Sequence, residues 1–159
     1  LEAGAAAPHR ELWHVDELVG QALAGLGPEA TRVRLAIGSE TPPVEVDAAQ
    51  IERVLANLLE NALRYSPSGS QVLLRVERGS TELRIHVIDS GAGLPDEQRE
   101  ALFQPFRRGE AGHGSGLGLA IARGFAEANG GRLWAQDDPG GGHLVLSLPL
   151  AERRAVVHA

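Results

Sequence analysis

The feature that most constrains the fold is a run of apolar residues between positions 51 and 65. Their spacing has the period of an α-helix, and the stripe comprises Ile51, Val54, Leu55, Leu58, Leu59, Ala62 and Leu63. Such a stripe predicts an amphipathic helix with one face turned toward a core. Asp47 is suited to cap its first turn, with Gln50 three residues later as in a capping box. Ser66-Pro-Ser-Gly69 predicts its end.

The other elements predict what this helix packs against. Alternating apolar and polar residues predict strands at 32–37, 44–46, 71–77, 82–89, 132–136 and 143–148, and helical spacing predicts further helices at 16–26, 96–103 and 117–129. Because this order contains few βαβ units, we expect an α+β fold, a two-layer sandwich whose mixed sheet has helices packed on one face. Residues 1–11 are predicted to be a linker, 12–150 one domain and 151–159 a tail.

Composition narrows the class of protein. At 159 residues and 43% hydrophobic, the chain has the size and apolar content of one globular domain. Its net charge of -6 and the lack of a basic run argue against a dedicated nucleic-acid binder. The absence of cysteine excludes disulfides, thiolate metal sites and a cysteine nucleophile. The chain begins Leu1-Glu-Ala-Gly4 without a methionine, which predicts a piece of a longer protein.

The polar face of the helix at 51–65 carries a candidate metal site. Asn57 and Asn61 are four residues apart and share one face, with Glu60 and Arg64 on the same polar side. Mg²⁺ takes oxygen ligands and completes its shell with waters and phosphate oxygens, so this face would suit a Mg²⁺–nucleotide complex. The alternative interpretation is an ordinary solvated polar face.

A second candidate site follows the strand at 82–89, in Asp89-Ser-Gly-Ala-Gly93. At the floor of a pocket, Asp89 would accept a hydrogen bond from an exocyclic amine such as adenine N6. Gly91 and Gly93 would let the backbone approach the ring where a Cβ would clash. The alternative is a common Asp-Ser-Gly turn that leaves a strand.

A glycine-rich loop at 112–118 leads into the last predicted helix. Gly114, Gly116 and Gly118 free backbone N–H groups to face an anion, and a helix N-terminus adds the positive end of its dipole. The loop lacks the lysine of a Walker motif and the parallel βαβ setting of a Rossmann site. The alternative is a flexible glycine loop without a ligand.

Residues 107–115 are predicted to form a lid over a bound nucleotide. Phe103 and Phe106 are expected to anchor it in the core. Arg107 and Arg108 are either phosphate contacts, which we favour, or surface charges. The six histidines are too scattered in the sequence to predict a metal cluster, and His86, within a strand, is expected to be structural.

Together and in this order, these segments resemble the ATP-binding catalytic domain of sensor histidine kinases, in the GHKL superfamily that also holds gyrase, Hsp90 and MutL. Residues 57–66 resemble the N box, 89–93 the first glycine box, 103–106 the F box and 114–118 the second glycine box. The resemblance covers about residues 12–150. Four boxes in the family's order form a specific signal.

The resemblance implies a Bergerat-fold sandwich with ATP between the N-box helix and the lid. It implies that Asn61 ligates Mg²⁺, that Asn57 contacts metal or phosphate, and that Asp89 binds adenine N6 partly through water. It implies that Glu60 orients or activates the attacking group, as the catalytic residue. Arg64 stands where the family usually has lysine. The implied nucleotide-binding set is Asn57, Asn61, Arg64, Tyr65, Asp89, Gly91, Gly93, Arg107, Arg108, Gly114, Ser115, Gly116, Leu117 and Gly118.

The flanking segments most resemble KdpD-type potassium sensor kinases, and the chain's start resembles the end of a dimerisation and phosphoacceptor domain. The acceptor motif, histidine-acidic-Leu-Arg-x-Pro, does not occur in the chain. The resemblance therefore implies transfer from ATP to a histidine on that separate domain, with a response regulator as a further partner. It also implies a cytoplasmic position in a homodimeric inner-membrane kinase, with this piece alone a monomer. The alternatives are a related ATPase that uses Glu60 as a general base for conformational work, and a non-catalytic interaction module.

Overall fold

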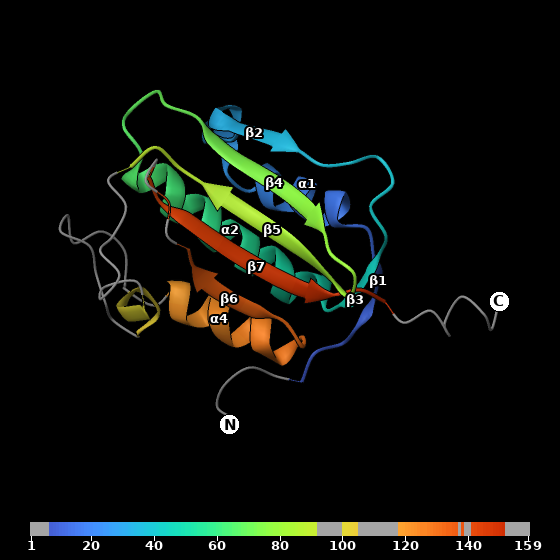
Figure 1. Ribbon diagram of the computed structural model, residues 1–159. Helices are drawn as coiled ribbons and strands as arrows, with labels where there is room; N and C mark the ends of the chain where they lie inside the picture. The colour runs from blue at the N-terminus through green and yellow to red at the C-terminus, as the bar shows by residue number, and fades with distance from the viewer. Residues whose placement is uncertain (1–6, 92–99, 105–117, 137, 139–140, 152–159) are drawn as a thin grey trace.

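The computed structural model describes residues 7–91, 100–104, 118–136, 138 and 141–151 of the chain. Its centre is a five-stranded sheet, and the described α-helices lie against one face of it (Figure 1). This arrangement confirms the predicted α+β sandwich with a mixed sheet. In chain order the elements are β1 (Glu11–Trp13), α1 (Val15–Ala24), η1 (Gly27–Arg32), β2 (Val33–Ala36), β3 (Val44–Val46), α2 (Ala48–Tyr65), β4 (Val72–Arg78), β5 (Glu82–Ile88), η2 (Glu100–Phe103), α4 (Gly118–Ala128), β6 (Arg132–Ala135) and β7 (His143–Pro149).

The sheet is mixed because one pair of strands at its edge is parallel. The strand order is β2-β4-β5-β7-β6, in which β2 runs parallel to β4 and the other neighbours are antiparallel. β4 and β5, both predicted as strands, form an antiparallel hairpin. On the other side of β5, Ile88 pairs with His143 at the start of β7. The residues that follow β5 and those that precede β7 therefore meet at one end of the sheet.

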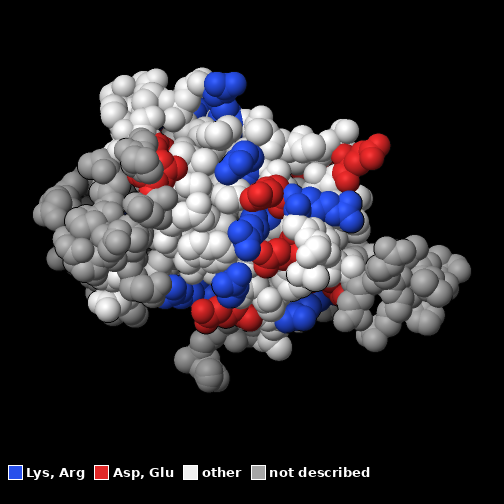
Figure 2. Space-filling view, viewed as in Figure 1, with Lys and Arg blue, Asp and Glu red and all other residues white. Residues whose placement is uncertain are grey.

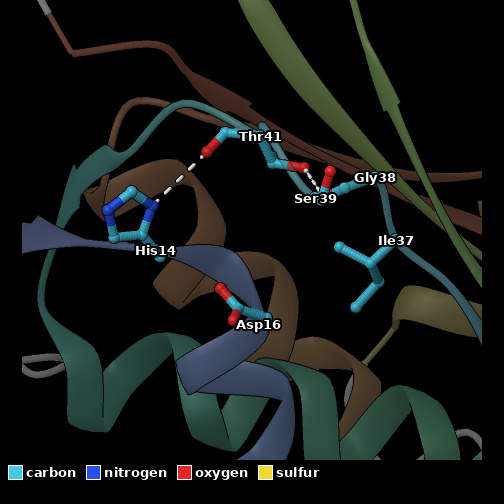
Figure 3. Close-up of a pocket in the computed structure, with 6 residues that line it drawn as sticks. All are labelled: His14, Asp16, Ile37, Gly38, Ser39 and Thr41. Atoms are coloured by element: carbon cyan, nitrogen blue, oxygen red, sulfur yellow. Dashed lines mark hydrogen bonds between the residues drawn. The ribbon is translucent and has the colours of Figure 1, made fainter.

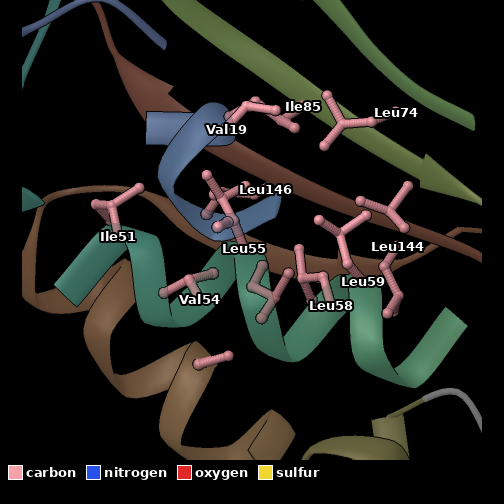
Figure 4. Close-up of a cluster of buried hydrophobic side chains, with 14 of the residues drawn as sticks. Val19, Ile51, Val54, Leu55, Leu58, Leu59, Leu74, Ile85, Leu144 and Leu146 are labelled. Atoms are coloured by element: carbon pink, nitrogen blue, oxygen red, sulfur yellow. The ribbon is translucent and has the colours of Figure 1, made fainter. Parts of the chain in front are cut away.

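The apolar stripe of α2 fills the space between the sheet and the neighbouring helices. Leu55, Leu58 and Leu59 are fully buried, and α2 contacts both α1 and α4. Figure 4 shows this cluster, in which α2 side chains lie beside strand residues such as Ile85 and Leu146. Burying one leucine contributes about 1.5–3 kcal/mol. Burial of this stripe therefore fixes the orientation of α2 about its own axis. That orientation determines which of its residues remain exposed to solvent.

The structure also contains short elements that the sequence does not predict. β1 has three residues, too few to show periodicity, and it forms by pairing with β3 in a small antiparallel sheet. η1 is a 3₁₀ turn before β2. Contacts extend into the predicted linker, because the His9 N–H donates to Asp47 Oδ2 at 2.8 Å and Arg10 Nη2 donates to the Ala128 carbonyl at 2.7 Å.

One predicted helix differs in the structure. Of the helix predicted at 96–103, the structure describes residues 100–103, which form the 3₁₀ turn η2 rather than an α-helix.

Within the described part of the chain, no helix combines the length and the apolar character needed to cross a membrane.

The cap of α2 leads to a testable prediction. Asp47 Oδ1 accepts a hydrogen bond from the Gln50 N–H at 3.1 Å, and Oδ2 accepts the one from His9. Asp47→Ala removes both acceptors, so we expect the free energy of unfolding to fall by about 1–2 kcal/mol. Urea denaturation at neutral pH measures this change.

Asp47→Asn removes the negative charge of the capping residue but keeps the cap itself, because asparagine caps a helix about as well as aspartate. The hydrogen bond from the His9 N–H is the main reason why the pKa of Asp47 is lowered in the fold. The resulting stability is present at neutral pH and is lost as the pH falls below 3.8 through the lower folded pKa. The wild type should therefore lose more stability on acidification than Asp47→Asn. Equal losses of stability in the wild type and in Asp47→Asn would show that the carboxylate charge of Asp47 does not contribute to the stability of the cap.

Candidate nucleotide-binding site

The polar face of α2 carries four of the predicted site residues. Asn57 and Asn61 are half-buried, whereas Glu60 and Arg64 are exposed. Tyr65, the last residue of α2, is 40% exposed. Leu58 and Leu59 lie between the two asparagines and are fully buried, so α2 cannot rotate about its axis without exposing them to water. α2 therefore offers a fixed set of amide and carboxylate oxygens at one side of the sandwich.

Asn57 connects α2 with the start of α4. Its Nδ2 donates to the carbonyl oxygen of Gly118 at 2.7 Å, and Gly118 is the first residue of α4. This bond places the end of the predicted phosphate loop against the polar face of α2. Among the described residues, no group bonds the Asn57 side-chain oxygen, which can therefore accept from a ligand donor or water, or bind a cation.

A second connection holds the opposite ends of the same two helices. Asn129, which follows α4 and is 1% exposed, donates through Nδ2 to Gln50 Oε1 at 2.9 Å. Its Oδ1 accepts from the Asp47 N–H at 2.8 Å. α4 is thus attached to α2 near both of its ends, which fixes Gly118, its first residue, against α2.

Asp89 lies directly after β5 and is held by two backbone donors. Its Oδ1 accepts from the Gly91 N–H at 2.7 Å and from the Gly142 N–H at 3.0 Å. The Asp89 N–H in turn donates to the Gly142 carbonyl at 2.9 Å. Among the described residues, no other group bonds this carboxylate, so Oδ2 is left to accept a hydrogen bond from a ligand. A fixed carboxylate with one free oxygen suits the role predicted for Asp89.

The backbone packs closely around this carboxylate. A Cβ added to Gly91 would lie 2.6 Å from the Tyr65 carbonyl oxygen, and one added to Gly142 would lie 2.5 Å from Asp89 Oδ2. Both positions need glycine because these approaches leave no room for a side chain. The end of α2, the end of β5 and the segment before β7 therefore converge at Asp89.

The segment before β7 is the part of the site that the sequence does not predict. From the sequence, residues 137–142 read as a connection between two strands. In the structure Gly142 holds Asp89, and Asp138 Oδ2 lies 3.0 Å from His143 Nδ1. The run of three glycines at 140–142 is a sequence signal for such a close approach, although it does not say which segment is approached.

Two buried histidines contact each other on the face of the sheet opposite the helices. His86 Nδ1 lies 2.8 Å from His143 Nε2, and His86 Nε2 lies 2.9 Å from Glu77 Oε1. Burial lowers the pKa of His86 despite its bond to Glu77, and the same bond lowers the pKa of Glu77. The sequence does not predict this contact between distant histidines. Across the described ranges, no group of three or more His, Cys, Asp or Glu side chains is arranged to hold a metal ion.

Part of the predicted nucleotide set lies outside the described residues, namely Gly93, Arg107, Arg108, Gly114, Ser115, Gly116 and Leu117. Phe106, one of the two predicted anchors, lies outside them as well. The other anchor, Phe103, is 5% exposed and belongs to the core, as predicted. The guanidinium of Arg123 on α4 lies over its ring, 4.2 Å from the centroid.

A surface hollow of about 350 Å³ lies elsewhere, between the start of α1 and the connection from β2 to β3 (Figure 3). It is lined by His14, Asp16, Ile37, Gly38, Ser39 and Thr41. His14 Nδ1 lies 3.3 Å from the Thr41 carbonyl oxygen at its rim. Because none of the predicted site residues lines this hollow, it is distinct from the candidate nucleotide site.

Comparison with known proteins agrees with the fold. Residues 46–152 match the family of histidine kinase-, DNA gyrase B-, and HSP90-like ATPases. The chain is 41% identical over 168 residues to the sensor protein KdpD of Mycobacterium tuberculosis, a match that covers 97% of this chain and 19% of that protein. It is 34% identical over 146 residues to KdpD of Escherichia coli, covering 89% and 16% respectively. The chain thus spans about a fifth of the length of these relatives.

Solved structures show the same architecture. The mycobacterial sensor histidine kinase MprB superposes with a TM-score of 0.75 at 26% identity, covering 89% of this chain and 97% of that chain. Full-length ShkA in complex with AMPPNP superposes with a TM-score of 0.79 at 26% identity, covering 92% and 33%. The family match includes α2, Asp89 and the glycine-rich segments. The chain therefore belongs to the family of histidine kinase-, DNA gyrase B- and HSP90-like ATPases.

Proposed function

We propose that this chain is the ATP-binding catalytic domain of a KdpD-type two-component sensor histidine kinase. The observation that carries the proposal is the Asp89 carboxylate near the end of α2. Two glycine N–H groups hold its Oδ1, and no described residue bonds its Oδ2. Its likeness to KdpD sensor proteins favours a kinase over the other members of the family. In this proposal the parent is a homodimeric inner-membrane kinase, and this piece is a cytoplasmic, monomeric part of it.

Asp89 recognises the base in this proposal. Adenine presents an exocyclic amine, a donor that the free Oδ2 accepts, whereas guanine presents a carbonyl oxygen that an ionised carboxylate repels. Gly91 lets the chain pass close beside this carboxylate, because a Cβ there would meet the Tyr65 carbonyl oxygen. Because two N–H groups already fix the carboxylate, it does not have to reorganise when the base binds. The site should therefore select ATP over GTP.

The donors on α2 fit Mg²⁺. Amide oxygens such as those of Asn57 and Asn61 are the hard ligands that this ion takes together with phosphate oxygens and waters. The bond from Asn57 Nδ2 to Gly118 leaves the Asn57 oxygen for this purpose. When bound, the ion would offset the negative charge of the phosphates. Arg64, exposed one turn after Glu60, would add positive charge on the same face.

The reaction in this proposal is an in-line transfer of the γ-phosphoryl group. The bond between the γ-phosphorus and the bridging oxygen breaks, and ADP leaves with its electron pair. A ring nitrogen of the acceptor histidine supplies the pair for the new P–N bond. Glu60, exposed beside Asn61, orients that ring or takes its proton. The acceptor histidine belongs to a dimerisation and phosphoacceptor domain, from which a response regulator takes the phosphoryl group.

Calorimetric titration with AMPPNP, with and without Mg²⁺, tests the proposal. We expect Mg²⁺-dependent binding in the micromolar range. A second assay supplies the phosphoacceptor domain of a KdpD relative and follows the γ-phosphate onto it. Absence of binding at millimolar nucleotide would contradict the proposal. Rapid ATP hydrolysis by the chain alone, lost in Glu60→Gln, would instead favour an ATPase that activates water.

Asn61→Ala isolates the metal contribution. Because the Asn61 oxygen is proposed to bind the cation and not the base, the variant should bind AMPPNP without Mg²⁺ as the wild type does. The gain in affinity on adding Mg²⁺ should shrink at least about tenfold, the effect of losing even an outer-shell partner of a metal. Gln71→Ala, an exposed position before β4, is the control and should keep the full gain. A full Mg²⁺ gain in Asn61→Ala would remove Asn61 from the metal site.

A further inference from the structure

The pairing of β5 with β7 continues one residue beyond the end of β5. Ile88 pairs with His143, so the next pair along the ladder is Asp89 with Gly142. The Asp89 N–H donates to the Gly142 carbonyl oxygen at 2.9 Å, as in a regular antiparallel pair. The return bond differs, because the Gly142 N–H donates to the side-chain oxygen Oδ1 of Asp89 at 3.0 Å. The carboxylate therefore takes the ladder bond that a main-chain carbonyl oxygen normally accepts.

This bond helps to fix the direction of the carboxylate. Oδ1 also accepts from the Gly91 N–H at 2.7 Å, so it is held both from the chain after β5 and from the chain before β7. Rotation of the carboxylate would break both bonds. Within the described residues no group bonds Oδ2, which makes it the oxygen available to a ligand. The residue opposite Asp89 in the ladder thus contributes to the choice of oxygen.

Gly142 also controls the space beside Oδ2. A Cβ at this position would lie 2.5 Å from Oδ2 and 3.0 Å from Cγ of Asp89, well inside the optimal contact distance of about 3.5 Å. The preceding residue is constrained in the same way. Gly141 has a φ of +146°, and a Cβ on it would collide with the main-chain carbonyl oxygen of Asp89. Both positions must lack a side chain for the carboxylate to stay where it is.

A side chain at position 142 would displace the carboxylate rather than the strand. β7 lies between β5 and β6 and is hydrogen-bonded to both of them (Figure 1). A shift of β7 would therefore disturb two ladders and the buried side chains of the strand. The carboxylate can instead turn about its single bonds at the loss of two hydrogen bonds. We expect Oδ2 to leave its present position in that case.

We propose that Gly142 is a specificity-determining residue of the nucleotide site, which holds Asp89 Oδ2 in the orientation that reads adenine and keeps the space beside it clear. The inference rests on the proposed function, because it takes Asp89 as the group that reads the base. Gly142 acts through Asp89 and is a positioning residue. It lies 53 positions from Asp89 and outside the four sequence boxes that resemble the kinase family.

Isothermal titration of Gly142→Ala with AMPPNP and GMPPNP tests this inference. AMPPNP affinity should fall at least about tenfold, as for a lost hydrogen bond to a charged group. GMPPNP affinity should not fall, because guanine presents a carbonyl oxygen where adenine presents its amine. The gain in AMPPNP affinity on adding Mg²⁺ should remain, because the proposed metal ligands lie on α2. A collapse of the Mg²⁺ gain together with the base preference would overturn the inference.

The substitution changes no charge, so electrostatic effects at a distance do not contribute to the result. This matters because basic and acidic side chains are interspersed over the face of the sheet nearest the viewer in Figure 2. Removing one of these charges would alter the affinity for an anion such as AMPPNP without any contact. Gly142→Ala avoids this effect.

Gly131→Ala is the matched control. A Cβ on Gly131 would collide with the Ser147 carbonyl oxygen, near the opposite end of β7 from Gly142. This substitution therefore also strains the backbone beside β7, but away from Asp89. It should lower stability in urea and keep the preference for AMPPNP over GMPPNP. An equal loss of preference in both variants would overturn the specific role of Gly142.

A double-mutant cycle shows whether Gly142 acts through Asp89. In Asp89→Asn the acceptor Oδ2 is already replaced, so adding Gly142→Ala should cost less than about a further threefold in AMPPNP affinity. Independent effects would instead multiply, because substitutions that do not interact are additive in free energy. The full tenfold loss in both backgrounds would overturn the inference.

A measurement on the wild type keeps the inference testable if Gly142→Ala does not fold. In the chain labelled with ¹⁵N glycine, the Gly142 amide signal should shift when AMPPNP is added. It should not shift with inorganic tripolyphosphate, which carries phosphates but no base. A Gly142 signal that ignores AMPPNP, or that responds equally to both compounds, would overturn this inference alone. Absence of AMPPNP binding to the wild type would overturn the proposed function and this inference with it.

Discussion

Asp89→Asn is expected to weaken AMPPNP binding by about ten- to a hundredfold, equivalent to about 1.5–3 kcal/mol for a hydrogen bond to a charged group. Asparagine can still accept from the Gly91 and Gly142 N–H groups through Oδ1, so the local backbone should keep its conformation. The atom in place of Oδ2 becomes an NH₂ donor and faces the donor amine of adenine. Isothermal titration of wild type and variant with the same nucleotide measures the loss.

Two comparisons make this result specific to the base. Asp16→Asn removes the same charge from an exposed position in the first turn of α1 and should leave the affinity unchanged. Because guanine carries an acceptor where adenine carries its amine, Asp89→Asn should also reduce the preference for ATP over GTP. Equal AMPPNP affinity in wild type and Asp89→Asn would reject Asp89 as the base-reading group, and the proposed function would lose its main support.

Leu55→Ala is expected to lower the free energy of unfolding by about 2–5 kcal/mol. Leu55 is fully buried in the middle of the α2 stripe, between the helix layer and the sheet. Shortening it removes apolar contacts and leaves a cavity between α2 and the sheet, which the surrounding close-packed core closes only in part. Urea denaturation followed by circular dichroism measures the change.

Leu35→Ala is the matched control for this substitution. It makes the same chemical change on β2, where the side chain is 49% exposed, and it should alter stability by no more than about 0.5 kcal/mol. A cost in Leu55→Ala no greater than that in Leu35→Ala would show that the α2 stripe is not the centre of the core. Should Leu55→Ala fail to fold, Leu55→Val, a smaller truncation, should still be less stable than Leu35→Ala.

The sequence predicts α2 well because the helical pattern depends only on residues three and four positions apart in the chain. Asp47 caps the helix as predicted, and the apolar stripe is buried as predicted. The strands β4 and β5 are also predicted, because apolar and polar residues alternate along each of them. These features depend on neighbours along the chain, whose preferences can be read without the fold.

β1 shows where such information ends. Its three residues carry no periodic pattern, and they form a strand because β3 lies beside them. The role of Gly142 is hidden for a similar reason. Gly142 and Asp89 are hydrogen-bonded although they are 53 positions apart in the chain. No sequence pattern near either residue indicates that β5 and β7 are neighbours in the sheet.

The sequence by itself determined which residues are proposed to carry the chemistry, namely the asparagines on one face of α2 and the carboxylate after β5. Only the tertiary structure decided which residues contact these side chains. Pairing of β5 with β7 brings Gly142 to Asp89 and His143 to His86, and packing of α4 on α2 brings Gly118 to Asn57. These contacts depend on strand order, register and helix packing, which form across the whole core and leave no local pattern in the chain.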